Sequence, residues 1–279
     1  MTQDEQPAPS VGAILLLAFA TALASTSLAA APAAEQAPSA GQAPPADQAP
    51  AADPAQVYAQ CMDQARAQPE AALKRANAWM RAGGGGPAAH CAVVALIGLG
   101  RTVEAAQRLE RLAKDTPDDG SGLRGQILAQ AGRTWLMAGE AERASAAQSA
   151  ALALDPNNTE LLIDRSISAA TAGRYWDAVD DLNRALDLAP DRPDILILRA
   201  SAYRALEAMD LARDDLKRAL GADPDNPDGL LERGNLRRLT GEDAGAAADW
   251  RRIIEIAPDS PAAAAARTNL ENLNKTQSE

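Results

Sequence analysis

The stretch that decides the fold is TELLIDRSISAATAGRYWDAVDDLNRALDLAPDR at residues 159–192, because the next 34 residues follow the same pattern. Residues 193–226 read PDILILRASAYRALEAMDLARDDLKRALGADPDN, and segments 125–158 and 227–260 keep this spacing. Four consecutive segments of one length predict a repeat protein in which each unit buries its apolar face against its neighbours.

The residues at matching positions explain how each segment folds into two antiparallel helices. Small residues at the eighth position and alanines at the twentieth let the two helices approach closely. The fifteenth position ends the first helix, where positive φ is wanted, and glycine occupies it in three of four segments. A proline near the end of each segment stops the second helix. In chain order these positions hold Gly132, Ser166, Ala200 and Gly234; Gly139, Gly173, Glu207 and Gly241; Ala144, Ala178, Ala212 and Ala246; and Pro156, Pro190, Pro224 and Pro258.

This 34-residue period, with its small residues and closing proline, resembles the tetratricopeptide repeat family. The resemblance has good register over residues 86–274 and is looser over 54–85. It implies an all-α, right-handed superhelical solenoid of antiparallel helix pairs, with a concave groove lined by the first helix of each pair. We therefore expect degenerate helix pairs at 54–119, four repeats at 125–260 and a capping helix at 261–274.

The first thirty residues have features of an export signal. Val11 to Ala24 is an apolar run of signal-peptide length, and Ser27-Leu28-Ala29 supplies the small-x-small pattern that signal peptidase accepts. The preceding MTQDEQPAPS has no Lys or Arg, which departs from the usual pattern. We expect a signal peptide at residues 1–29 and a periplasmic or secreted protein. The alternative is an inner-membrane anchor formed by the uncleaved segment, the one case in which we expect membrane contact.

Residues 30–53, rich in Ala, Pro and Gln, are expected to be a disordered linker.

Composition excludes several classes of function. The formal net charge of −11, from 38 acidic and 27 basic residues, argues against binding nucleic acid through its phosphates. One histidine in the chain argues against a metal site, and Gly83 to Gly86 lacks the Lys-Ser/Thr of a phosphate loop. We therefore expect no cofactor, no metal, no small-molecule substrate and no catalytic residue.

Charged residues recur with the same period at two positions. Arginine stands at the seventh position of three segments and aspartate at the twenty-third, on the second helix. Because both partners repeat together, and Arg binds a carboxylate with two parallel hydrogen bonds, we predict a ladder of partly buried ion pairs. The alternative is that the arginines contact a ligand. The residues are Arg165, Arg199 and Arg233 with Asp181, Asp215 and Asp249.

By resemblance to the family, the second, fifth, ninth, twelfth and thirteenth positions of each first helix face the groove. The fifth position forms an apolar ridge, and arginines flank it. Such a surface suits an extended or helical partner segment with apolar anchors and some acid. The alternative, for the fifth position above all, is simple packing between repeats. The candidate groove residues are Ile163, Ile167, Ile197, Arg204, Leu231, Asn235 and Arg238.

The two cysteines, Cys61 and Cys91, are 30 residues apart on what we predict to be successive first helices. Such helices are adjacent in this fold, so a disulfide is geometrically reasonable in an exported chain. The alternative is a catalytic cysteine with His90 as its base. Neighbours on one helix point about 100° apart, which is poor geometry for that chemistry.

These observations predict a protein-interaction scaffold or adaptor of the bacterial cell envelope, without enzymatic activity. Its partners are expected to be proteins whose identity the sequence does not reveal. Three alternatives stay open. The first two are a homo-oligomer formed through the end helices, and a non-catalytic subunit of an envelope enzyme or of a secretion or wall-assembly complex. The third, which the residues favour least, is an enzyme in its own right.

Overall fold

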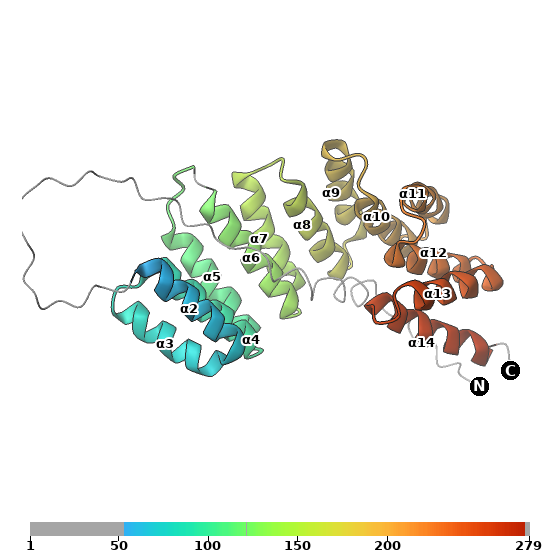
Figure 1. Cartoon of the computed structure of the whole chain (residues 1–279). Helices are drawn as coiled ribbons and strands as arrows, with labels where there is room; N and C mark the ends of the chain where they lie inside the picture. The colour runs from blue at the N-terminus through green and yellow to red at the C-terminus, as the bar shows by residue number, and fades with distance from the viewer. Residues whose placement is uncertain (1–52, 121, 277–279) are drawn as a thin grey trace, which may run out of the picture. The chain divides into compact units, whose positions relative to one another are not determined.

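The computed structural model describes residues 53–120 and 122–276, and all the regular structure in these ranges is α-helical. The expected signal peptide and most of the expected linker lie outside the described residues. The described residues form two compact units, 53–117 and 118–276 (Figure 1). Within them, no helix combines the length and apolar character that crossing a membrane requires.

The unit of residues 53–117 contains four helices. Its core is built largely from small side chains such as Ala65, Ala72 and Ala88, which lets the helices pack closely. The Asp53 carboxylate caps the first helix by accepting a hydrogen bond from the backbone N–H of Ala55 at 3.0 Å. The helices are α2 (Pro54–Ala67), α3 (Pro69–Arg81), α4 (Gly85–Gly98) and α5 (Thr102–Asp115).

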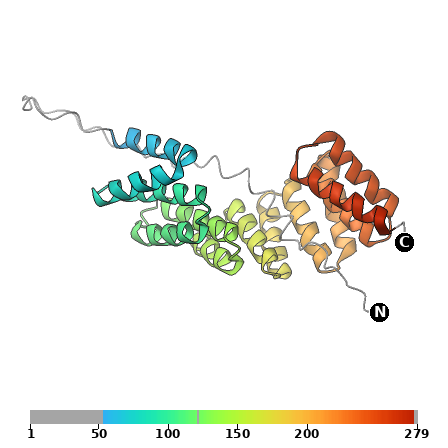
Figure 2. The ribbon, with the colours of Figure 1, turned by 90° about the horizontal axis from the view of Figure 1, so that it is seen from below.

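The unit of residues 118–276 is a stack of four antiparallel helix pairs followed by a last helix (Figure 2). This architecture confirms the predicted all-α solenoid. Its helices are α6 (Leu123–Met137), α7 (Ala141–Leu154), α8 (Thr159–Thr171), α9 (Tyr175–Leu188), α10 (Pro193–Ala205), α11 (Met209–Ala222), α12 (Pro227–Leu239), α13 (Asp243–Ile256) and α14 (Pro261–Thr276).

Local sequence signals set where these helices begin and end. Asn158 and Asn226 cap α8 and α12 by accepting backbone N–H bonds from Leu161 and Gly229 at 3.1 and 3.0 Å. In the turn between the two helices of a pair, the residue at the fifteenth position has a left-handed backbone conformation. Its φ is between 77° and 81° in the three repeats where this residue is glycine. Glu207 occupies the same position with φ of 59°, the one positive φ of a non-glycine residue among the described residues.

Two glycines mark where the paired helices are in closest contact. A Cβ atom on Gly132 would lie 2.6 Å from Cγ of Gln148, and one on Gly234 would lie 2.5 Å from Nε1 of Trp250. Real Cβ atoms do not approach other atoms this closely, so larger residues at these places would force the second helix away.

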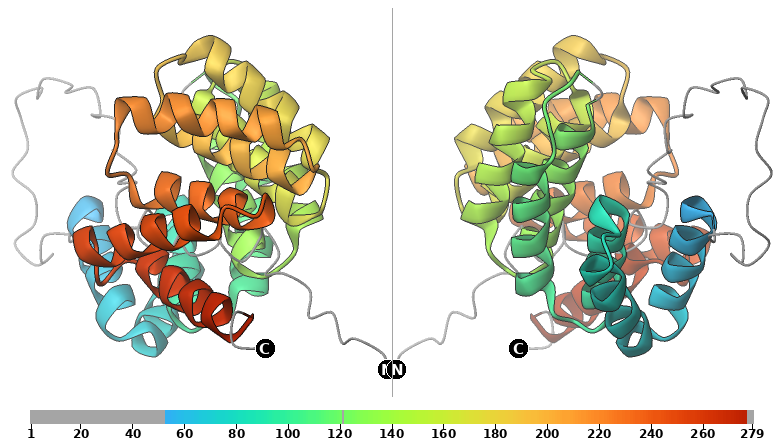
Figure 3. Two further views of the ribbon diagram at one scale, coloured as in Figure 1. Left: turned by 90° about the vertical axis from the view of Figure 1, so that its right-hand side faces the viewer. Right: turned by 90° about the vertical axis from the view of Figure 1, so that its left-hand side faces the viewer.

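The first helices of successive pairs also contact one another directly. Contacts join α6 to α8, α8 to α10, α10 to α12 and α12 to α14, so these five helices form a continuous row that α14 ends. In the left view of Figure 3, the dark red α14 lies at the end of the unit that faces the viewer. We call the side of the unit formed by α6, α8, α10, α12 and α14 the A-helix face.

Candidate functional site

The structure joins the periodic arginines and aspartates in bidentate pairs, each between the two helices of one repeat. Arg165 donates from Nε and Nη2 to Asp181 at 2.7 and 2.6 Å, and Arg199 donates in the same way to Asp215 at 2.7 Å for both bonds. Arg233 reaches Asp249 at 3.0 and 2.7 Å. These hydrogen bonds raise the pKa of each arginine above its ordinary value.

The first two pairs also connect to the preceding repeat. Nη1 of Arg165 donates to the Ser149 hydroxyl at 3.1 Å, and Nη1 of Arg199 donates to Oδ1 of Asn183 at 2.7 Å. All three aspartate side chains are buried, so these arginines bind carboxylates inside the fold. This geometry favours the ladder of structural ion pairs over the alternative, in which the arginines contact a ligand.

A second set of polar contacts runs along the A-helix face and links consecutive repeats. Arg133 donates to Asp164 at 2.7 Å, and Arg204 donates from Nε to Glu232 at 2.8 Å. Asn269 Nδ2 donates to Oδ1 of Asn235 at 2.9 Å. Sequence reasoning missed these links because no single pair of residue types repeats. The available signal was an acidic residue at the sixth position of a repeat, Asp164 or Glu232, together with an arginine on the first helix of the preceding repeat.

The two carboxyl groups of this second set are buried. Burial raises the pKa of the Asp164 carboxyl, and the charge and hydrogen bond of Arg133 oppose that rise. Glu232 is buried as well, where it accepts from both Arg204 and the Ser201 hydroxyl. Both carboxylates are therefore structural partners of neighbouring helices.

The expected exposed apolar ridge is not present. Ile163, Ile167, Ile197 and Leu231 are only 2 to 6% exposed. Consecutive first helices pack directly on these side chains: a Cβ on Gly229 of α12 would lie 3.3 Å from Cδ1 of Ile197 on α10. The fifth position therefore packs between repeats, which was the alternative interpretation.

The three polar candidates for the groove are engaged within the protein. Arg204 binds Glu232 and Asn235 binds Asn269, as described above. Arg238 pairs with Asp243 at 3.4 Å across the turn of its own repeat. The arginines expected to attract an acidic partner are thus already paired with carboxylates of this chain.

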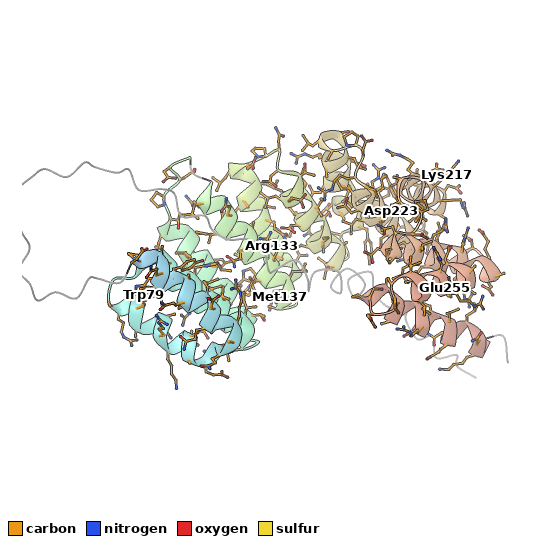
Figure 4. The ribbon with its side chains drawn as sticks, viewed as in Figure 1. Trp79, Arg133, Met137, Lys217, Asp223 and Glu255 are labelled. Carbon is orange, nitrogen blue, oxygen red and sulfur yellow. A yellow bond between two sulfur atoms is a disulfide. The ribbon has the colours of Figure 1, made fainter. Side chains whose placement is uncertain are left out.

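Different side chains remain exposed along the A-helix face. Met137 and Leu239, at the thirteenth position of their repeats, are 40% and 57% exposed. Met137 lies one turn after Arg133 on α6 (Figure 4). At the opposite ends of the helices, Arg192 bridges Glu160 and Asp194 of two successive repeats at 2.5 and 2.6 Å.

The cysteines form a disulfide that joins α2 to α4, with a Cα–Cα distance of 6.1 Å. Both residues are fully buried, so Cys91 is not a reactive thiol. His90 lies with Nδ1 2.7 Å from the Tyr58 hydroxyl. Among the described residues, no group of His, Cys, Asp and Glu is arranged to hold a metal ion.

Comparisons with known proteins agree with this architecture. A family model for the tetratricopeptide repeat matches residues 163–227 and 197–261. No curated protein matches the chain in sequence. Among solved structures, a tetratricopeptide repeat protein from Parabacteroides merdae superposes with a TM-score of 0.54 at 19% identity, covering 66% of this chain and 71% of that one.

A thermophilic tetratricopeptide repeat protein from Thermus thermophilus gives a TM-score of 0.52 at 23% identity, covering 65% of this chain and 94% of its own. At these identities the structures show the fold alone. The helix pairs, the 34-residue register and the family match over residues 163–261 lead to one conclusion. Residues 163–261 are tetratricopeptide repeats, and the helix pairs around them share that fold.

Proposed function

We propose that the protein is a non-catalytic scaffold of the bacterial cell envelope that binds a segment of a partner protein along its A-helix face. A tetratricopeptide array is typical of protein-interaction scaffolds. The observation that carries the proposal is a continuous row of first helices, cross-linked by buried polar contacts, that still exposes Met137 and Leu239. Such a surface binds without losing much conformational entropy of its own, because its helices are already ordered.

Location in the envelope is inferred from the disulfide and the N-terminal sequence. Cys61 and Cys91 are bonded and fully buried, and such bonds persist in oxidising compartments. Intact mass of the protein from cells tests the location: loss of residues 1–29 and of two hydrogens supports it. A full-length chain with two alkylatable thiols would contradict it.

The function is tested by affinity capture from envelope extract with the full chain and a Met137→Glu/Leu239→Glu variant. These side chains are exposed, so the changes leave the core intact, whereas changes at Ile197 or Arg204 would disturb packing. A Leu211→Glu variant is the matched control, because Leu211 lies on α11, a second helix, and its exposure is between those of Met137 and Leu239.

We expect a protein captured by wild type and control to be lost with the double variant. Direct binding of that purified protein, with at least a tenfold weaker Kd for the double variant, would establish the A-helix face as the binding surface. Equal binding by all three proteins would exclude this face.

A further inference from the structure

A polar pocket of about 260 Å³ lies between α7, α8 and α9, within the unit of residues 118–276. It is flanked by the second helices of two repeats and by the first helix between them. Its lining contains none of the exposed residues of the A-helix face. The lining residues are Ser145, Ser149, Arg165, Ala169, Arg174, Asp177, Asp180 and Asp181.

The repeat that contributes α8 and α9 to the pocket has a small residue at its eleventh position. The four repeats carry Trp135, Ala169, Tyr203 and Arg237 at this position. The other three repeats have a larger side chain at this position. The Tyr203 ring lies 5.7 Å from the Arg199 guanidinium, Arg237 donates to Asp249 at 2.7 Å, and Trp135 is buried. Ala169 offers only a methyl group, which is itself 1% exposed, so no side chain from this position covers the Arg165 guanidinium.

The seventh-position arginine beside an aromatic ring is the least exposed of the three. The Arg199 side chain, next to Tyr203, is 15% exposed, whereas Arg165, next to Ala169, is 25% exposed and Arg233, next to Arg237, is 34% exposed. Arg165 and Arg199 make the same bidentate bond to their aspartate. Arg165 therefore has the same anchoring as Arg199 without a ring against its guanidinium.

The polar groups around the pocket can form hydrogen bonds with a hydroxyl group. Arg165 is paired with Asp181, and Arg174 is paired with Asp177 at 2.6 Å, while Asp180 adds a third carboxylate to the lining that can accept a hydrogen bond. Arg174 also leaves a buried Nε–H without an acceptor among the described residues. A ligand with an aromatic face and a hydroxyl group would supply a stacking surface for Arg165 and a hydrogen-bonding group for the polar wall.

We propose that this pocket binds a tyrosine side chain of a partner polypeptide, which stacks beside Arg165 as Tyr203 stacks beside Arg199. That this tyrosine belongs to a partner protein rests on the proposed scaffold function. The pocket itself is a second contact surface, separate from the A-helix face, and it is tested without any partner.

The test measures binding of p-cresol, the tyrosine side-chain analogue, to the full chain by NMR titration. We expect saturable binding that shifts the Nε–H resonance of Arg165. Ala169→Tyr places the chain's own ring in the pocket and Ala169→Arg copies Arg237. Each filled variant is expected to bind p-cresol at least tenfold more weakly, and Ala169→Tyr is expected to raise the Tm. The Met137→Glu/Leu239→Glu variant should bind p-cresol as wild type does, which separates this proposal from the function of the A-helix face.

A second variant keeps the proposal testable should both filled variants fail to fold. Tyr203→Ala opens the equivalent space beside Arg199, so it is expected to lower the Tm and to gain a second p-cresol site. No saturable p-cresol binding by wild type, or binding that is the same in the filled variants, would overturn the proposal. Tighter binding of n-butylamine, the lysine side-chain analogue, than of p-cresol would overturn the choice of tyrosine.

Discussion

Arg199 and Asp215 show what a repeated charge pair contributes when it is buried. Asp215 is almost fully buried, and both of its oxygens accept from one guanidinium. Removing Arg199 would leave this buried charge with only the longer contact to the exposed Arg218, at 3.9 Å. The loss exceeds anything expected from an exposed pair.

We therefore expect Arg199→Ala to lower the free energy of unfolding by about 3–5 kcal/mol. Arg213→Ala is the control, because its pair with Asp210 is exposed, and it should cost less than about 1 kcal/mol. Urea denaturation followed by circular dichroism measures both. A similar small loss for the two variants would show that the ladder is not structural.

Through the buried Asp164, the stability of the fold should depend on pH. The sign of this dependence is set by whether burial or the attraction of Arg133 has the larger effect on the pKa of Asp164. Burial raises its pKa in the folded state, against the opposing Arg133. A carboxyl with a raised folded pKa favours the protonated folded protein, so its contribution to stability increases as pH falls through that pKa. The stability of wild type relative to Asp164→Asn should therefore rise between pH 7 and pH 3.5 in urea denaturation. A fall would mean that the attraction of Arg133 outweighs burial.

At the scale of single elements, the turn between α10 and α11 carries avoidable strain. Glu207 has φ of 59°, where the corresponding residues of three other repeats are glycine. The left-handed conformation costs a non-glycine residue about 1–2 kcal/mol, and a glycine would remove this cost. Part of the stability gained in this way is offset, because glycine makes the unfolded chain more flexible. Glu207→Gly should raise the unfolding free energy by about 0.5–1 kcal/mol, measured by thermal denaturation. The reverse control, Gly173→Ala, should lower it; a loss in both would contradict the explanation.

The contact between α12 and α13 depends on Gly234. A Cβ there would meet the Trp250 ring at 2.5 Å, so Gly234→Ala should destabilise by about 1–3 kcal/mol through overpacking. Gly221 on α11 is the matched control, since a Cβ there would meet nothing within 4 Å. Gly221→Ala should be neutral or stabilise by up to about 1 kcal/mol. Calorimetry compares the two, and equal effects would refute the packing argument.

At the scale of the whole molecule, the disulfide is confined to one of the two units. It closes a loop of 30 residues within residues 53–117. A loop of that size corresponds to about 3–4 kcal/mol of stabilisation through the unfolded chain. Cys61→Ala/Cys91→Ala should therefore increase hydrogen exchange in α2 to α5 and leave α6 to α14 unchanged, as read by mass spectrometry. Equal loss of protection in both units would show that they unfold together.

The sequence by itself determined the helix pairs of the solenoid and the partners in the ion-pair ladder. Both depend on short-range signals: the asparagine caps of α8 and α12, the glycines at the fifteenth position, and arginines and aspartates that repeat together every 34 residues. The disulfide partners were predictable for a related reason, because the repeat order places α2 beside α4.

Only the tertiary structure decided which side chains are exposed. Ile197 and Arg204 matched groove positions, yet the close approach of consecutive first helices buries Ile197 and pairs Arg204 with Glu232. That approach depends on the volumes of side chains on two repeats at once, so no pattern within a single repeat could reveal it. The pocket beside Arg165 has the same origin, because its lining comes from two repeats that only the assembled helices bring together.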